Sequence, residues 1–320
     1  MAITGPASYL STTDEFLIHW LLANTSLGAG NELVLPGGGT QAALQALRDA
    51  LGTKVDLLVT RLTEAAVARG EIDLLKVSLH LRLNQLIEKV RALHEGSKWE
   101  RSLPFVPGIT EGQGNFLPPL DVANSVWGMI NADTTVPDIT LLGGYTRAMF
   151  VTDIAALKQA YTDWITAKTM ADVAREERND LQDDVYEMLR KYRRNLPTAF
   201  ATGHAIVDSM PRLTPEPGST PEAVIANIVW DPVLQAARIT WTASTAANLS
   251  AFQIRFCAGP DYSTDDESVI GTVDPSAPRE FVTIASLANP GDLASFKVYV
   301  ITATGNEKGS NTVTITRTVA

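Results

Sequence analysis

The most regular pattern of apolar and polar positions lies between Thr152 and Asn195, a stretch that contains neither proline nor glycine. Two rows of side chains recur there at intervals of seven residues, which is typical of a long helix packed against other helices. At 1.5 Å per residue the predicted helix 152–195 is about 65 Å long, more than a compact domain needs. One row consists of Trp164, Ala171, Arg178, Val185 and Tyr192, and the other of Ala160, Ala167, Ala174, Leu181 and Met188.

A second helical pattern covers residues 41–95, where leucine, isoleucine and valine recur on both sides of Gly70. Two interpretations are open. Either Gly70 follows the last residue of one helix and Asp73 caps the next, which gives an αα-hairpin, or one helix continues through Gly70 at a cost of about 1 kcal/mol relative to alanine. We favour the hairpin, because a glycine followed by acidic residues is a common way to end one helix and begin another.

Residues 96–144 form an irregular insertion that is interrupted by prolines and glycines, with one short helix expected at about residues 120–131. A loop of this length within a compact domain is uncommon and is usually functional or disordered. Its apolar side chains, among them Phe105, Phe116 and Trp127, argue against disorder. The insertion must therefore pack on its own helical bundle, which we favour, or on a neighbouring subunit.

The clearest domain boundary is the proline-rich segment 209–222, which predicts a stiff, extended linker. Residues 1–208 before it form the predicted α-helical bundle. After it, in residues 223–320, apolar and polar positions alternate as they do in β-strands. The predicted fold class is thus multidomain α plus β, an elongated helical bundle or coiled coil followed by an antiparallel β-sandwich. Seven strands are expected, at residues 227–231, 237–244, 249–258, 268–273, 280–287, 295–305 and 311–319.

The last hundred residues resemble a fibronectin type III domain. Trp241 stands in the position of the core tryptophan of that family, and Phe252 stands where an aromatic residue is usual. Phe296 departs from the pattern, because it replaces the family's corner tyrosine and so removes a hydrogen bond worth about 1 kcal/mol. The resemblance implies a spacer or binding module without catalytic residues. The closing stretch follows the family pattern at Leu287, Pro290, Val298, Val300, Ala303, Gly309 and Ser310.

The order of the whole chain resembles a group of uncharacterised bacterial proteins that join a helical bundle to a fibronectin type III-like sandwich. This resemblance implies no activity. The net charge of −10 argues against a nucleic-acid partner, because phosphate binding needs clustered lysine and arginine. The longest apolar run near the start, residues 16–23, is too short to span a membrane, and no basic segment with an apolar core indicates a secretory signal. We therefore expect a protein that stays in the cytoplasm or is exported by a non-standard route.

Residue patterns that carry chemistry are scarce. The four histidines are scattered, and Cys257 is the single cysteine, so that no intrachain disulfide can form. Metal ligands and phosphate-binding glycines do not occur at the required spacings, and we expect no cofactor, metal or catalytic residues. The loop around Tyr262, Asp265 and Asp266 is the one possible ligand-binding loop, although its carboxylates lack the alternate spacing of a calcium loop.

We therefore expect a non-enzymatic structural protein that assembles into a homo-oligomer or a filament-like array. The helical region would mediate oligomerisation, and the sandwich would be displayed or would bridge subunits. The alternative is a binding module in which the sandwich recognises a protein or a carbohydrate through Tyr262, Asp265 and Asp266. The candidate interface residues are Trp164, Ala171, Arg178 and Val185 on the long helix, and Phe105, Phe116 and Trp127 in the insertion.

Overall fold

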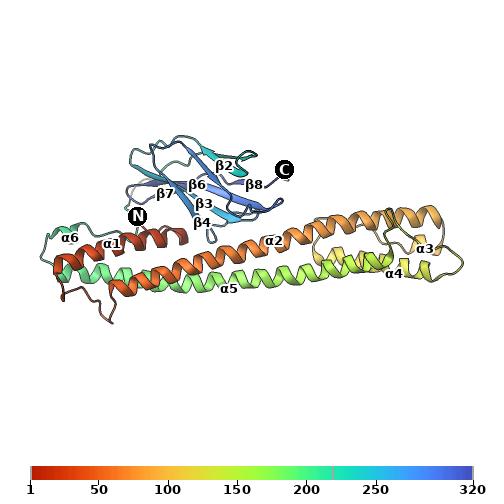
Figure 1. The fold of residues 1–320 in the computed structure, drawn as a ribbon, viewed down its shortest axis with the longest axis horizontal. Coiled ribbons are helices and arrows are strands. Elements are labelled where there is room, and N and C mark those ends of the chain that lie inside the picture. Colours follow the sequence, from red (N-terminus) through yellow and green to blue (C-terminus); the bar gives the residue numbers. More distant parts are fainter. Residues whose placement is uncertain (1, 218–219, 319–320) are drawn as a thin grey trace. The chain divides into compact units, whose positions relative to one another are not determined.

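A computed structural model describes residues 2–217 and 220–318 of the chain (Figure 1). The chain divides into two compact units. Unit 1 comprises residues 1–63 and 170–320, and unit 2 comprises residues 64–169. This division does not follow the linker 209–222, because the β-sandwich belongs to the same unit as the first and last parts of the helical region.

Two helices of 53 residues each belong partly to one unit and partly to the other: α2 (Gln41–Leu93) and α5 (Arg147–Ala199). The hairpin that we favoured from the sequence is wrong, since α2 continues through Gly70. Apart from its chain neighbours and the backbone of its own helix, no described atom lies within 4 Å of the place where a Cβ of Gly70 would stand, so this glycine occupies an ordinary exposed helical position. The burial of Ile72 and Leu79, which follow it in the same helix, outweighs the helix penalty of about 1 kcal/mol.

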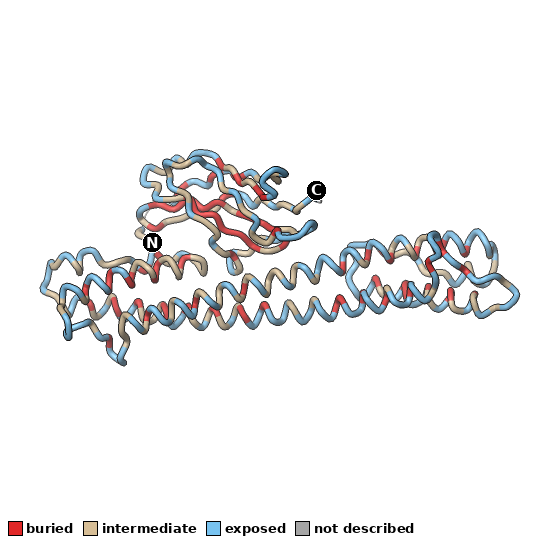
Figure 2. Tube along the Cα trace, in the orientation of Figure 1, coloured by how far each residue is buried: buried red, intermediate tan, exposed pale blue. Residues whose placement is uncertain are grey.

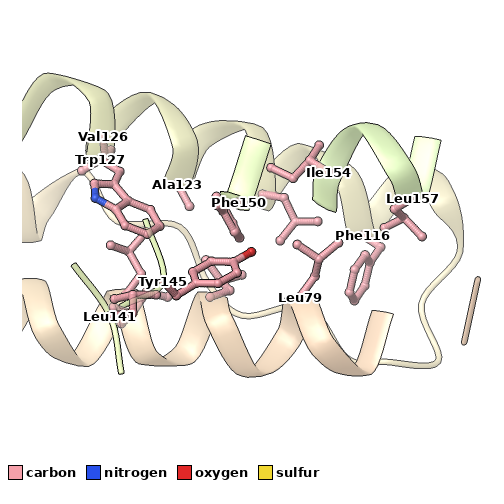
Figure 3. Close-up of a cluster of buried hydrophobic side chains, with 14 of the residues drawn as sticks. Leu79, Phe116, Ala123, Val126, Trp127, Leu141, Tyr145, Phe150, Ile154 and Leu157 are labelled. Carbon is pink, nitrogen blue, oxygen red and sulfur yellow. The ribbon is translucent and has the colours of Figure 1, made fainter. Parts of the chain in front are cut away.

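Unit 2 is a helical body with one apolar core, which Figure 3 shows in close-up. Its elements are the second part of α2, the short helix α3 (Lys98–Arg101), α4 (Gln113–Ala132) and the first part of α5. Leu79 of α2, Phe116 and Trp127 of α4, and Phe150 of α5 are fully buried in this core.

The insertion 96–144 therefore packs on its own unit, which confirms the interpretation that we favoured. Its helix α4 is longer than the predicted 120–131, because it begins before Pro118 and Pro119 rather than after them. The two prolines lack the N–H groups that an inner helical turn needs. The buried side chains on either side of them, Phe116 and Leu120, anchor this turn to the core.

The helical part of unit 1 has a separate core. Here α1 (Tyr9–Leu27), which follows a short 3-10 helix η1 (Pro6–Ser8), contributes Phe16 and Trp20. The core is completed by Leu44 and Leu51 from α2, by Val185, Leu189, Tyr192 and Leu196 from α5, and by Leu213.

The C-terminal part of unit 1 is an antiparallel β-sandwich, which confirms the predicted fold class of a helical region followed by a sandwich. One sheet has the order β1 (Ala226–Asp231), β2 (Ala236–Trp241), β5 (Glu280–Thr283). The other has the order β4 (Ser268–Val273), β3 (Leu249–Ala258), β6 (Leu293–Thr302), β7 (Glu307–Gly309), with β8 (Val313–Thr316) also paired to β6. Residue 319 of the last expected strand lies outside the described residues.

All seven expected strands are present in the sandwich, and β7 is an additional short one. Trp241 and Phe252 pack together in the core, with ring centroids 5.5 Å apart. Phe296 is fully buried against Phe256, so that the position without a tyrosine hydroxyl keeps its packing. Figure 2 shows the buried residues concentrated along these strands.

The linker 209–222 is attached to the rest of unit 1 rather than free. Leu213 is buried in the helical core, and its carbonyl oxygen accepts a hydrogen bond of 2.9 Å from the N–H of Ile3. Further along, the N–H of Glu216 donates to the carbonyl oxygen of Thr304 in the sandwich, at 3.2 Å. Residues 218 and 219 lie outside the described residues. A short helix, α6 (Ala205–Asp208), precedes this segment.

Candidate functional surfaces

The predicted interface row on α5 is mostly used by contacts within the chain. Ala171 and Arg178 are 2% and 3% exposed, and Val185 is fully buried in the helical core of unit 1. Trp164 packs at the edge of the unit 2 core, where the guanidinium of Arg69 lies 5.4 Å from its ring centroid. These four side chains therefore do not form a continuous free surface.

The candidates in the insertion separate into two kinds. Phe116 and Trp127 are fully buried, and the indole N–H of Trp127 donates to the carbonyl oxygen of Ile139 at 3.0 Å. Side chains buried within their own unit cannot contact a second molecule, so an interface role remains open only for Phe105, which is 73% exposed.

An exposed apolar row that sequence reasoning missed lies along α2 in unit 2. It consists of Val67, Leu74 and Leu81, which are 55%, 75% and 53% exposed, and we call it the α2 stripe. At about 100° per residue, a spacing of seven residues keeps the three side chains on one helix face. The repeat is visible in the sequence, but periodicity alone does not tell which of two neighbouring rows faces the core.

Exposed apolar side chains are concentrated in unit 2. Among the described residues, unit 2 holds 13 of the 26 large hydrophobic side chains that are exposed, although it comprises only a third of the chain. Val77 lies beside the α2 stripe. Leu142 is 80% exposed in a glycine turn whose backbone is attached to α2, because Arg82 donates to the carbonyl oxygen of Leu142 at 3.3 Å. Where exposed apolar side chains form a contiguous patch, the patch is a candidate interaction site.

The predicted ligand loop of the sandwich is bound by α5. The guanidinium of Arg175 donates to both carboxylate oxygens of Asp266, at 2.6 and 3.1 Å, and Arg178 donates to the carbonyl oxygen of Asp265 at 2.5 Å. We call these contacts the α5 clasp. Bonding to Asp266 raises the pKa of Arg175, and burial lowers the pKa of Arg178. Two groups of candidate residues, predicted separately, are therefore in contact with each other.

The third member of that loop, Tyr262, belongs to a buried network. Its hydroxyl donates to Glu267 Oε2 at 2.5 Å, and the hydroxyl of Tyr299 donates to the same oxygen at 2.8 Å. Arg255, which is 1% exposed, donates to Glu267 Oε1 at 2.6 Å and to both carboxylate oxygens of Glu307. These five side chains form what we call the Arg255 network.

The electrostatics of the Arg255 network favour a charged Arg255 and neutral hydroxyls on Tyr262 and Tyr299. Burial alone would lower the pKa of Arg255, but the bonds to Glu307 and Glu267 outweigh it and raise that pKa. Burial, and then the charge of Glu267, raises the pKa of Tyr262 and of Tyr299. Sequence reasoning missed Arg255, because an arginine in an outward strand position is normally solvated.

A cavity of about 770 Å³ lies beside the Arg255 network. Glu267, Tyr299 and Glu307 line it from the network, and Asp265 lines it from the clasped loop. The N-terminal residues 3–6 form another part of the wall.

Other side chains that could be reactive form hydrogen bonds within the fold instead. Burial raises the pKa of Cys257 to about 11, and its thiol donates to the carbonyl oxygen of Ser263. His19 is buried between the hydroxyl of Tyr192 and the carbonyl oxygen of Ile206, at 2.7 and 2.9 Å, and burial lowers its pKa. Within residues 2–217 and 220–318, no group of three or more His, Cys, Asp or Glu side chains could hold a metal ion. No helix in the same ranges is long and apolar enough to cross a membrane.

No protein-family model matches this sequence, and no curated protein matches it either. Several solved structures are similar to this chain over about a third of its length. The fn3 domain of human contactin 1 shares 14% identity over 32% of this chain and 81% of its own, with a TM-score of 0.25. Pectate lyase PelI from Erwinia chrysanthemi shares 17% identity over 29% of this chain, with a TM-score of 0.25, and the match spans only 28% of that enzyme. Weak structural neighbours thus include fibronectin type III domains.

Proposed function

We propose that the chain is a non-enzymatic structural protein that assembles with further copies of itself through the helices of unit 2. The observation that supports this best is the α2 stripe. Its seven-residue spacing on one exposed helix face is that of one of the two apolar rows in the seam of a coiled coil. Covering a side chain as exposed as Leu74 contributes about 2 kcal/mol to association.

The α2 stripe is symmetric about Leu74, which favours pairing with an identical helix. Val67 and Leu81 stand seven residues before and after it, and the small residues Gly70 and Ser78 stand four residues before and after it. In an antiparallel pair with a two-fold axis at Leu74, Val67 meets the partner subunit's Leu81. A two-fold interface needs such a self-complementary surface.

Light scattering on the purified full-length protein tests the assembly. We expect a mass that is a multiple of 34.5 kDa, and a monomer for Leu74→Asp with unchanged helical circular dichroism. Val233→Asp is the matched control, because Val233 is 89% exposed in unit 1, outside the proposed interface. A wild-type monomer at high concentration, or equal dissociation of both variants, would contradict the proposal.

Engineered cysteines test the antiparallel register. A disulfide needs Cα atoms less than about 7 Å apart, so Leu74→Cys should form a disulfide-linked dimer on mild oxidation. The Val67→Cys, Leu81→Cys double variant should cross-link as well, whereas Val67→Cys alone should not. The buried native Cys257 serves as the internal control. Cross-linking of Val67→Cys by itself would indicate a parallel pair and exclude the two-fold axis at Leu74.

A further inference from the structure

Strand β7 stands at the edge of its sheet, and within residues 2–217 and 220–318 some of its backbone groups have no hydrogen-bond partner. The N–H of Thr302 donates to the carbonyl oxygen of Asn306 at 3.0 Å, and the N–H of Ser310 donates to that of Val298 at 2.9 Å. In an antiparallel ladder, residues that face the partner strand alternate with residues that face away. The N–H and C=O groups of Glu307 and Gly309 therefore point away from β6.

The cavity of about 770 Å³ lies along this free edge, since both Glu307 and Gly309 line it. This volume is within the usual range for sites that hold a ligand. The N–H groups of the N-terminal wall are not paired with the edge of β7. Its N–H groups at Thr4 and Gly5 both donate to the hydroxyl of Ser8, at 2.9 and 3.2 Å.

The charged residues of the lining are mostly acidic, with three carboxylates and Lys308. Glu267 and Glu307 accept hydrogen bonds at each of their oxygens and share the single guanidinium of Arg255. The side chain of Asp265 accepts no hydrogen bond within the described part of the chain and lies at the surface. A lining with this balance of charges favours a cationic ligand group.

We propose that this cavity binds an extended segment of a partner polypeptide that carries a lysine or arginine. The segment adds a strand to β7 through the backbone of Glu307 and Gly309, and its basic side chain lies beside Glu267, Glu307 and Asp265. Strand addition at a sheet edge derives affinity from backbone hydrogen bonds and specificity from side-chain pockets. A small free amine would use the carboxylates but leave the backbone groups of β7 unpaired, so the edge favours a peptide.

The test uses the full-length chain and a labelled, end-capped pentapeptide, Thr-Val-Lys-Val-Thr. We expect saturable binding by fluorescence anisotropy, and slower amide hydrogen exchange in residues 305–310 when the peptide is bound. The matched peptide Thr-Val-Glu-Val-Thr should bind at least about tenfold more weakly, which corresponds to 1.4 kcal/mol.

Variants locate the site on the chain. Asp265→Asn removes a carboxylate without breaking a hydrogen bond. It should lower the affinity for the lysine peptide severalfold and leave the thermal unfolding midpoint unchanged. Glu307→Gln should lower the affinity for the lysine peptide further. Glu280→Gln on β5, whose carboxylate pairs with Arg238 instead, is the matched control and should bind as the wild type does.

Three outcomes would overturn the proposal. The first is no binding of the lysine peptide, and the second is equal binding of the lysine and glutamate peptides. The third is competition by 1-aminobutane at equal affinity without protection of residues 305–310, which would make the cavity a site for a small amine. None of these readouts depends on the oligomeric state.

Discussion

The carboxylate of Asp266 accepts two parallel hydrogen bonds from the guanidinium of Arg175, with Nε–Oδ1 at 2.6 Å and Nη2–Oδ2 at 3.1 Å. Both side chains are mostly shielded from water, at 25% and 16% exposure. Paired, planar contacts of this kind are stronger than single ones. The contact holds the loop before β4 on α5, and this loop in turn carries Tyr262 and Glu267 of the Arg255 network.

Breaking this contact should loosen the loop. We expect Arg175→Met to lower the free energy of unfolding by about 2 kcal/mol, because a partly buried Asp266 loses its charged partner. Hydrogen exchange in residues 259–267 should become faster. Arg190→Met is the control, since Arg190 pairs with Glu187 at the surface and such pairs contribute about 0.5 kcal/mol. Equal effects of the two variants would show that the clasp is an ordinary surface ion pair.

Local patterns predicted the elements well because their causes are local. The strands β3 and β4 coincide with the predicted ranges 249–258 and 268–273, since alternation and turn residues determine both. Arg178 stands in the predicted row with Ala171 and Val185, and a buried guanidinium there needs a hydrogen-bond partner. The sequence could not show that the partner is the carbonyl oxygen of Asp265, 87 residues further along the chain.

Other features depend on tertiary contacts, which the sequence of a single segment does not predict. Gly70 fits both a helix end and a helix interior, and the choice is made by the core that Ile72 and Leu79 enter. Arg255 lies between Ile254 and Phe256, where an outward side chain is usually solvated. Its burial follows from the loop that covers the outer face of β3, and the cavity beside it includes residues 3–6 from the other end of the sequence.

Because Gly70 lies inside a helix, replacing it by alanine should stabilise the protein. At the end of a helix in a hairpin, the same substitution would destabilise it. Gly70→Ala should raise the free energy of unfolding by about 1 kcal/mol, because alanine is the better helix former and the added methyl group meets no described atom outside the neighbouring backbone of its own helix within 4 Å. Gly143→Ala is the contrasting control, since Gly143 has a φ of +76° and alanine there should destabilise by about 1 kcal/mol. Urea unfolding measures both, and a destabilising Gly70→Ala would argue for a break in α2.

Gly271 on β4 leaves the space that Phe281 of the facing sheet fills. A Cβ at this position would stand 2.4 Å from a ring carbon of Phe281, much closer than contact distance. We expect Gly271→Ala to lower the free energy of unfolding by about 2 kcal/mol, because either the ring or the strand must shift. Adding Phe281→Leu to this variant should recover part of the loss. Additive losses in the double variant would contradict the proposed contact.

The raised pKa of Tyr262 predicts how stability changes in alkaline solution. Burial and the charge of Glu267 keep its hydroxyl protonated in the folded chain above the usual pKa of 10.0. In the unfolded chain this hydroxyl loses its proton near pH 10, so the folded state binds more protons there. The contribution is complete below about pH 10 and is lost above it, by about 1.4 kcal/mol per pH unit.

Tyr262→Phe should therefore start about 1 kcal/mol less stable at pH 8, because Glu267 loses one hydrogen bond. Between pH 10 and about pH 11.5 its stability should fall less steeply than that of the wild type. Part of the wild-type slope should remain, since the pKa values of Tyr145, Tyr192 and Tyr299 are raised as well. Urea unfolding at a series of pH values measures the slope. Parallel curves for the two proteins in this interval would mean that Tyr262 does not keep its proton in the folded state.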